Sequence, residues 1–198
     1  MNERQIKIKE ICSERNIRWL VHFTQVNNLC SILREGLLSR KKLESWPSSK
    51  RPHFSDRFRD DSYTGANCLS ITSPNYPMFR KYQIKYPDII WAVLAIEPRV
   101  LWELNCAFCA RNASSIMMRN VPIDKLMLPD SLEGLFHGVQ GNLPCNCQAE
   151  VLVFNTLSPQ YIKWIYFKND KEHRTWKENC TYKNVPCSVD ASLFNFRR

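Results

Sequence analysis

The sequence has few of the features that would place it outside the class of ordinary globular proteins. It contains only 5 glycines among 198 residues, no internal repeat and no low-complexity segment, and 12% of its residues are aromatic. This composition argues against a disordered chain. No apolar run has the length of a membrane span, and the charged start MNERQIKIKE lacks the apolar core of a signal peptide. We therefore expect a soluble cytoplasmic protein that folds as a single domain over residues 1–198.

The common nucleotide- and metal-binding motifs are also missing. No G-x-G-x-x-G opens a helix after a strand, no G-x-x-x-x-G-K-[ST] is present, and H-E-x-x-H does not occur. These absences exclude a Rossmann dinucleotide site, a P-loop and a zincin-type metal site. Helical and strand patterns are mixed without regular alternation, which favours an α+β fold over a doubly wound sheet.

The charge of the chain is strongly one-sided. It carries 28 Lys and Arg against 19 Asp and Glu, for a net charge of +9. A protein with this charge attracts polyanions without further specificity. Two interpretations remain open at this point: a basic protein with a solvated face, and a protein with a nucleic-acid partner.

Cysteine is abundant, with nine residues. An odd number without a secretory signal does not indicate a disulfide framework. Cys106 and Cys109 form a C-x-x-C pair, and Cys145 and Cys147 form a second close pair that would complete a four-ligand zinc site. The C-x-C spacing and the phenylalanine inside the first pair are unusual for zinc. We therefore favour reduced thiols that act as small core residues, and expect no metal.

Apolar periodicity predicts the main elements. We expect helices over 5–14, over 24–37 with Thr24 as the cap, and from Pro77 onward. Strands are predicted over 17–24, 68–72, 89–98, 148–154 and 161–167, with 89–98 the best candidate for an interior strand. Residues 39–67 read as a long basic loop, 100–128 as short helices and loops, and the tail after 169 as polar and basic with little apolar period.

Two polar residues stand out on apolar elements. Glu150 opens the apolar run EVLVF, where burial of a carboxylate costs several kcal/mol unless it is partnered. A solvated position at a sheet edge would avoid that cost. His22 lies in the first predicted strand, where it is either an ordinary core or surface residue or a functional one.

The order of these polar residues carries a resemblance. A histidine ends an early strand, a strand and turn with Ser and Tyr follow in mid-chain, and Q-x-E opens a late strand, which is similar to the plan of ADP-ribosyltransferases. The segments HFTQVNNLCSILREGLLSR, SPNYPMF, QAEVLV and LSPQYIKWIYF resemble the DarT family of DNA ADP-ribosyltransferase toxins. The match covers roughly residues 15–168. The basic loop and CAFCARNASS depart from the thymine-modifying members, which favours guanine as the acceptor.

The resemblance implies a fold and an activity. It implies an α+β fold with an ADP-ribosyltransferase-like split sheet and flanking helices. It also implies NAD+ as co-substrate, a base of single-stranded DNA as acceptor, and a macrodomain-type antitoxin as partner in a toxin–antitoxin or phage-defence system. The alternatives are transfer to RNA or protein, and a non-catalytic, basic nucleic-acid-binding module.

The resemblance also implies roles for individual residues. A carboxylate beside the ribose stabilises the oxocarbenium-like transition state, which is the role expected for Glu150. An arginine upstream of the second strand assists, with Arg57 favoured over Arg59. The loop 130–147, with Phe136, His137 and Asn142, would read the acceptor. The expected binding residues are His22, Thr24, Asn28, Tyr76 and Met78 for NAD+, and Gln148, His137 and Arg51 for the acceptor.

Overall fold

The computed structural model describes residues 1–52, 54, 63–180 and 184–195. Its strands are β1 (Leu20–Gln25), β2 (Asn67–Ile71), β3 (Trp91–Ile96), β4 (Cys106–Cys109), β5 (Glu150–Val153), β6 (Ile162–Phe167) and β7 (Cys187–Val189). Its helices are α1 (Glu3–Glu14), α2 (Leu29–Glu35), α3 (Arg40–Glu44), α4 (Tyr76–Lys85), α5 (Val100–Glu103), α6 (Ile116–Arg119), α7 (Ile123–Leu126), α8 (Pro129–Gly134) and α9 (Asp170–Asn179). Short 3-10 turns lie at Val26–Asn28, Ser48–Lys50, Pro159–Tyr161 and Ala191–Phe194.

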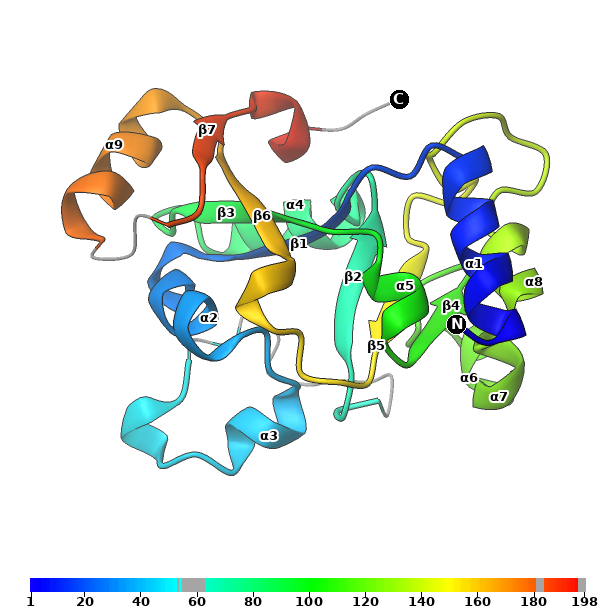
Figure 1. Cartoon of the computed structure of the whole chain (residues 1–198). Helices are drawn as coiled ribbons and strands as arrows, with labels where there is room; N and C mark the ends of the chain where they lie inside the picture. The colour runs from blue at the N-terminus through cyan, green and yellow to red at the C-terminus, as the bar shows by residue number, and fades with distance from the viewer. Residues whose placement is uncertain (53, 55–62, 181–183, 196–198) are drawn as a thin grey trace.

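The strands form one seven-stranded sheet in the order β4-β5-β2-β1-β3-β6-β7 (Figure 1). All neighbours are antiparallel except β6 and β7. β1 pairs with β3 along its whole length but with β2 only at Leu20 and Val21. The sheet therefore opens between β1 and β2 into a β4-β5-β2 half and a β1-β3-β6-β7 half. This confirms the predicted α+β class with a split sheet and flanking helices.

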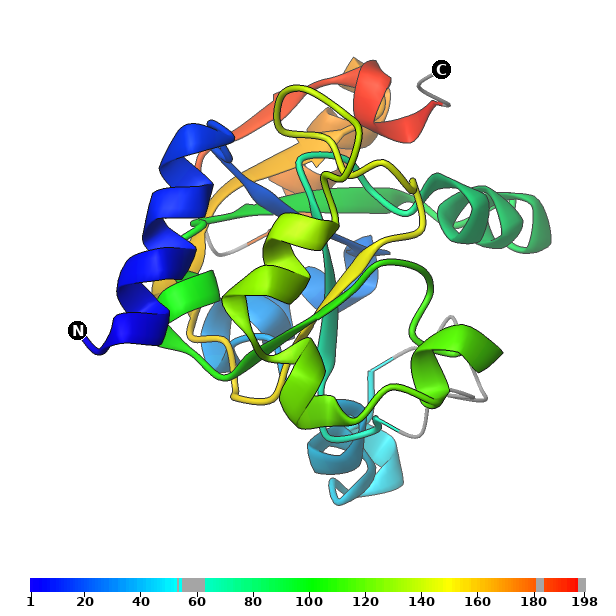
Figure 2. The ribbon, with the colours of Figure 1, turned by 90° about the vertical axis from the view of Figure 1, so that its right-hand side faces the viewer.

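The interior strand predicted over 89–98 is β3, and all its side chains are buried. Alternate residues face opposite sides of a sheet. Trp91 and Val93 accordingly pack with Phe79 and Tyr82 of α4, whereas Leu94 and its neighbours on the other side join the main core. At the β4 end, α1 packs against α5 and α8 (Figures 1 and 2). Among the described residues, no helix has both the length and the apolar character needed to cross a bilayer.

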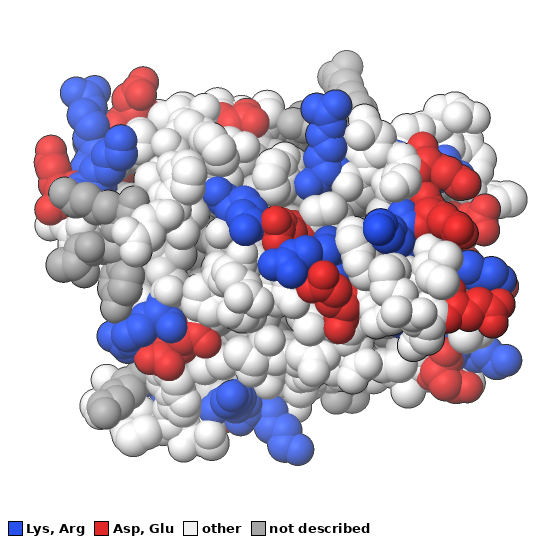
Figure 3. Space-filling model, in the orientation of Figure 1, with Lys and Arg blue, Asp and Glu red and all other residues white. Residues whose placement is uncertain are grey.

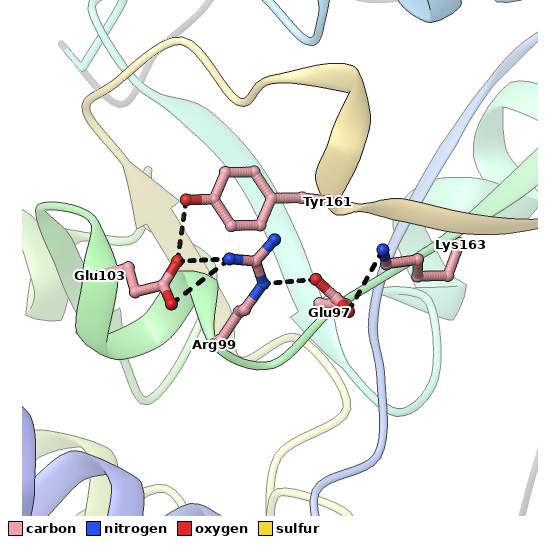
Figure 4. A network of polar contacts seen from close by, with 5 residues as sticks. All are labelled: Glu97, Arg99, Glu103, Tyr161 and Lys163. Carbon is pink, nitrogen blue, oxygen red and sulfur yellow. Dashed lines mark hydrogen bonds and ion pairs between the residues drawn. The ribbon is translucent and has the colours of Figure 1, made fainter.

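The corner between β3 and β6 carries a network of charged groups (Figure 4). Arg99 donates to Glu97 and to Glu103, Lys163 lies 3.3 Å from the Glu97 carboxylate, and the Tyr161 hydroxyl donates to Glu103 at 2.9 Å. Acidic and basic side chains are intermixed on the face of the molecule that Figure 3 shows. The network therefore fixes a corner of the fold, and this face presents no field of a single sign.

Several local predictions differ from the structure. Residues 100–128 contain a strand, β4, which the pattern missed because four apolar residues buried on both faces show no alternation. The polar tail contains α9, whose one buried residue is Trp176, and β7, which joins the sheet. Thr24 does not cap a helix; it belongs to β1, and Gln25 precedes a 3-10 turn that leads into α2.

Candidate active site

A cavity of about 490 Å³ lies where the sheet splits. Its walls come from β1, β2 and the first residue of β5, from α2, α3 and α4, and from the turn that follows β4. Its volume is within the range of about 300–1,000 Å³ that small-molecule sites occupy. The cavity therefore brings together residues that are far apart in the sequence, including both residues singled out on the predicted strands.

Glu150 lines this cavity and is only 5% exposed. Asn75 and Asn112 donate their side-chain Nδ2 groups to Oε1, at 3.2 and 3.0 Å. The backbone N–H of Ala113 donates to Oε2 at 2.9 Å. Within the described residues, three donors from two segments compensate the burial of the carboxylate and fix its orientation. The solvated alternative for Glu150 is therefore wrong.

Asn75 is itself held in place at the start of α4. Its backbone N–H donates to the Ser70 hydroxyl at 3.2 Å, and its side-chain Oδ1 accepts from the Met78 N–H as the helix cap. One residue thus ends the turn after β2, starts α4 and contacts Glu150. Its 2% exposure leaves the side chain little freedom to turn away from the carboxylate.

Asn112 lies in the turn after β4. Its Oδ1 accepts hydrogen bonds from both the backbone N–H and the hydroxyl of Ser114. Since the oxygen is bound within the turn, the Nδ2 group is directed at Glu150. The strand register supports this placement, because Cys109 of β4 lies opposite Glu150 of β5. The turn therefore starts beside the carboxylate that it contacts.

His22 and Thr24 lie two residues apart on β1, so they share a face of the strand, and both line the cavity. His22 Nδ1 lies 2.9 Å from the carbonyl oxygen of Cys68 in β2. A carbonyl only accepts, so Nδ1 carries the proton in this contact. The Thr24 hydroxyl accepts from Asn28 Nδ2 at 3.3 Å. Asn28 also lines the cavity, so three predicted NAD+ residues meet there.

Of the two remaining residues predicted to bind NAD+, one lines the cavity and one does not. Met78 lines the cavity from α4, whereas Tyr76 is half-buried and is absent from the lining. Gln148 also lines the cavity. It does so from a turn rather than from the strand, which begins at Glu150, and its N–H donates to the Asn146 side chain at 2.8 Å. Its predicted position on the strand face of Glu150 is therefore wrong, although it does reach the site.

The other two predicted acceptor residues, Arg51 and His137, do not line the cavity. Arg51 donates to the carbonyl oxygens of Trp46 and Glu44, at 2.9 and 2.6 Å, and is not part of the lining. His137 is exposed outside the cavity, and Phe136 is fully buried in the main core. Phe136 fails as a base-stacking residue because its ring is fully buried, with the Arg15 guanidinium 5.1 Å from its centroid. Asn142 is not part of the lining either, and its side chain donates to the Asn16 carbonyl oxygen. Arg57 and Arg59 lie outside the described residues.

The cavity also has residues that the sequence did not single out. Arg40 and Lys81 bring positive charge to the described lining, and Glu35 brings negative charge. The Arg40 guanidinium lies 3.8 Å from the centroid of the Phe54 ring, and Trp46 is part of the same wall. The mixture of flat aromatic surface, cations and neutral hydrogen-bonding groups suits a large polar ligand with an aromatic ring and phosphate groups.

The four-cysteine zinc alternative is wrong. Cys106 and Cys109 are three residues apart on one strand, so they face opposite sides of the sheet and pack in different apolar clusters. Cys145 and Cys147 are exposed. Across the part of the chain that the structure describes, no group of three or more His, Cys, Asp or Glu residues could hold a metal ion.

A family model described as "ssDNA thymidine ADP-ribosyltransferase, DarT" matches residues 21–192. The chain belongs to the DarT family. This confirms the family and the enzyme class predicted from the sequence. No curated protein matches the chain.

Solved structures of the family have the same fold. Thermosipho africanus DarTG in complex with ADP-ribose is 20% identical with a TM-score of 0.63, over 89% of this chain and 51% of that one. Thermus sp. 2.9 DarT in complex with ADP-ribosylated ssDNA is 16% identical, with a TM-score of 0.58, over 91% and 97%. The same Thermus protein in complex with NAD+ is 13% identical, with a TM-score of 0.53, over 90% and 98%. The chain thus spans about half the length of DarTG, and the NAD+ complex agrees with the predicted co-substrate.

Proposed function

We propose that the chain cleaves NAD+ in the cavity of the split sheet and transfers ADP-ribose to a base of single-stranded DNA. The observation that carries this proposal is the buried Glu150 carboxylate, fixed by three N–H donors and facing a cavity that His22 also lines. Family membership and the neighbouring complexes with NAD+ and with ADP-ribosylated ssDNA support the same donor and acceptor.

The reaction breaks the bond between nicotinamide and the ribose C1′, and nicotinamide leaves with the bonding electrons as a neutral molecule. Positive charge develops on the ribose as the bond stretches. The Glu150 carboxylate stabilises that charge, and its fixed orientation means that little reorganisation is needed during the reaction. A nitrogen of the acceptor base then bonds to C1′, and Glu150 takes the proton that the base releases.

In this proposal NAD+ binds mainly to residues of the β1-β3-β6-β7 half of the sheet and of the helices beside it. His22 Nε2 accepts from a ribose hydroxyl, and the polar groups of Thr24 and Asn28 complete the contacts. Arg40 and Lys81 carry the charge that a pyrophosphate requires, and the wall of Trp46 and Phe54 offers flat surface for the adenine ring. Met78 packs against nicotinamide. Roles for Tyr76, Arg51 and His137 are not carried forward, because none of them lines the cavity.

The acceptor base is proposed as thymine or guanine. The description of the matching family names thymidine, whereas the unusual middle segment of the sequence favoured guanine. Gln148 is the described residue proposed to contact the acceptor, since it lines the cavity beside Glu150. Arg57 and Arg59 stay predictions for assisting the transfer.

The biological setting is proposed from the same relatives. A toxin that marks DNA requires a partner that removes the mark, and the name DarTG of the Thermosipho africanus protein fits a toxin paired with an antitoxin. We propose a macrodomain-type antitoxin as the partner of this chain, a single domain over residues 1–198, and a cytoplasmic location.

One experiment tests the proposed function. The protein, NAD+ and a single-stranded oligonucleotide with all four bases are incubated, and the products are fragmented in a mass spectrometer. The expected product is the oligonucleotide plus one ADP-ribose on thymine or guanine, absent with Glu150→Ala. RNA and protein acceptors are run in parallel. If NAD+ is consumed and the ADP-ribose is found on RNA or protein instead of DNA, the acceptor is not DNA. If the amount of NAD+ does not change, the proposal is contradicted.

A further inference from the structure

Helix α6 presents two adjacent apolar side chains to solvent. Ile116 is 77% exposed and Met117 is 61% exposed. They are the only exposed large apolar side chains that are neighbours in the sequence, within the residues that the structure describes. Single exposed apolar residues are normal on a protein surface, whereas a contiguous apolar patch often marks a binding surface.

The helix that carries this pair is anchored. Met118 is 9% exposed and packs in an apolar cluster with Ala113 and Leu126. The Ser115 hydroxyl accepts from the Met118 N–H and caps the helix, and Arg119 Nε donates to the Ser114 carbonyl at 2.6 Å. Ile116 and Met117 are therefore held outward by a fixed turn of helix, and neither belongs to a loose end of the chain.

The pair lies close to the catalytic carboxylate. Asn112 donates to Glu150, and Asn112 and Ser114 both line the cavity. Four Cα–Cα steps separate Asn112 from Ile116, so their Cα atoms lie at most about 15 Å apart. Figure 2 shows α6 projecting on the side of the sheet from which α4 also projects. The exposed pair therefore follows, within a few residues of the chain, a turn that lines the cavity.

Basic residues flank the apolar pair in the sequence. Arg111 precedes the turn and Arg119 ends α6, so a guanidinium lies on each side of the apolar pair in the sequence. The chain as a whole carries a net charge of +9. Phosphates bind cations, and apolar side chains such as Ile and Met insert between bases in proteins that unstack nucleic acids.

We propose that Ile116 and Met117 form an unstacking wedge for single-stranded DNA. The wedge packs against the base next to the acceptor and breaks its stacking with the acceptor, which can then turn into the cavity toward Glu150. An enzyme that modifies a base must expose the reactive edge of that base. This inference rests on the proposed function for its DNA substrate, but it gives a role to a surface that lies outside the cavity lining.

The test measures DNA binding separately from the chemistry. In a Glu150→Gln background, which prevents turnover, Ile116→Ser/Met117→Ser is compared with the unaltered surface and with Ile6→Ser as a matched control. Ile6 is an exposed isoleucine on α1. A fluorescent oligonucleotide reports affinity by anisotropy, and 2-aminopurine beside the acceptor reports unstacking by its increased fluorescence.

The double substitution is expected to weaken single-strand binding about tenfold, to abolish the 2-aminopurine increase and to leave duplex binding unchanged. In the presence of native Glu150, release of nicotinamide from NAD+ without DNA should stay within twofold of the parent. Equal single-strand binding and equal 2-aminopurine signals would overturn the wedge. So would an unaltered surface that binds no oligonucleotide, or a double variant that loses only binding to a protein partner.

These outcomes separate the inference from the proposed function. If the wedge variant loses single-strand binding while no ADP-ribose is ever transferred to DNA, the wedge stands and the proposed reaction fails. If transfer to DNA occurs and the wedge variant transfers as well as its parent at low oligonucleotide concentration, the reaction stands and the wedge fails.

Discussion

The two halves of the split sheet present different kinds of polar group to the cavity. In the β4-β5-β2 half, a buried carboxylate on Glu150 receives three N–H donors from residues 75, 112 and 113. In the β1-β3-β6-β7 half, hydrogen-bonding groups on His22, Thr24 and Asn28 line the same cavity. A fixed charge suits the stabilisation of a transition state, whereas neutral donors and acceptors suit the binding of sugar hydroxyls. Substitutions in the first half should therefore lower kcat, and those in the second should raise the KM for NAD+.

The largest effect is expected at the carboxylate. Glu150→Gln keeps the shape of the side chain but removes its charge, so nicotinamide release at saturating NAD+ should fall about 10³-fold. Binding of NAD+, measured by calorimetry, should stay within about threefold, since the contacts assigned to binding lie on the other half. A variant that retains a tenth of the native kcat would contradict the catalytic assignment of Glu150.

Asn112→Asp tests whether the donors to the carboxylate matter for the rate. The change removes an N–H donor and places a second carboxylate about 3 Å from Glu150, so we expect kcat to fall about 10²-fold with a small change in KM. Asn112→Ala, which removes only the donor, should cost about tenfold.

Asn120→Asp is the matched control for Asn112, because Asn120 is an exposed asparagine at the end of α6. It should leave kcat unchanged. Thermal unfolding of all three variants separates a catalytic loss from a loss of fold. If Asn112→Asp changed only the KM, the division of roles between the halves would be wrong.

His22→Ala should raise the KM for NAD+ about tenfold and change kcat less than threefold. It removes an acceptor for a ribose hydroxyl and the hydrogen bond to the Cys68 carbonyl across the split, each worth about 1 kcal/mol. His137→Ala is the control and should leave the KM for NAD+ at its native value, since His137 is exposed outside the cavity. Steady-state kinetics at varied NAD+ give both parameters. A pure kcat effect at His22 would place it with the catalytic half.

The smallest effect is expected away from the cavity, in the charged network at the corner between β3 and β6. Burial opposes ionisation of Glu97, but hydrogen bonds from Arg99 and Lys163 outweigh it and hold its pKa below the usual 4.5. A lowered pKa in the folded state stabilises the fold above the unfolded pKa, and that stabilisation is lost as pH falls through the folded value. Glu97→Gln should therefore lower the free energy of unfolding at pH 7 by less than about 1 kcal/mol.

The pH dependence of unfolding checks this assignment. The difference between native protein and Glu97→Gln should shrink as the pH falls below 4.5. Activity at pH 7 should be the same for both, because the network lies outside the cavity. A difference that grew in acid would show that the Glu97 carboxylate is not stabilised in its ionised form.

The sequence predicted the parts of the site that local patterns report. Glu150 and His22 stood out as polar residues on apolar strands, and the resemblance to the DarT family assigned both of them to one site. The partners of Glu150 were missed: Asn75 and Asn112 reach it from 75 and 38 residues away, and no periodicity predicts a contact over that distance. The only signal was that each asparagine lies in a turn directly after a strand. Gln148 lines the cavity from a turn and not from the predicted strand, because the boundary of β5 depends on its pairing with β4.

The fold was likewise predicted where a strand or helix has a clear pattern of its own, and missed where it has none. β3 was predicted because it is long and wholly apolar, whereas β4 and β7 were missed because a strand of three or four residues is defined by its neighbour rather than by its own pattern. The α9 helix was missed because Trp176 is its one buried residue, so its sequence shows almost no apolar face.

The central claim is that Glu150 carries out the chemistry while the β1 half binds NAD+. The measurement that tests it most directly is the single-turnover rate of nicotinamide release, with enzyme in excess over NAD+ and single-stranded DNA present, for native protein, Glu150→Gln and His22→Ala. At saturating enzyme, Glu150→Gln should be about 10³-fold slower and His22→Ala within threefold of native. A Glu150→Gln rate close to native, or a His22→Ala rate as low as that of Glu150→Gln, would contradict the claim.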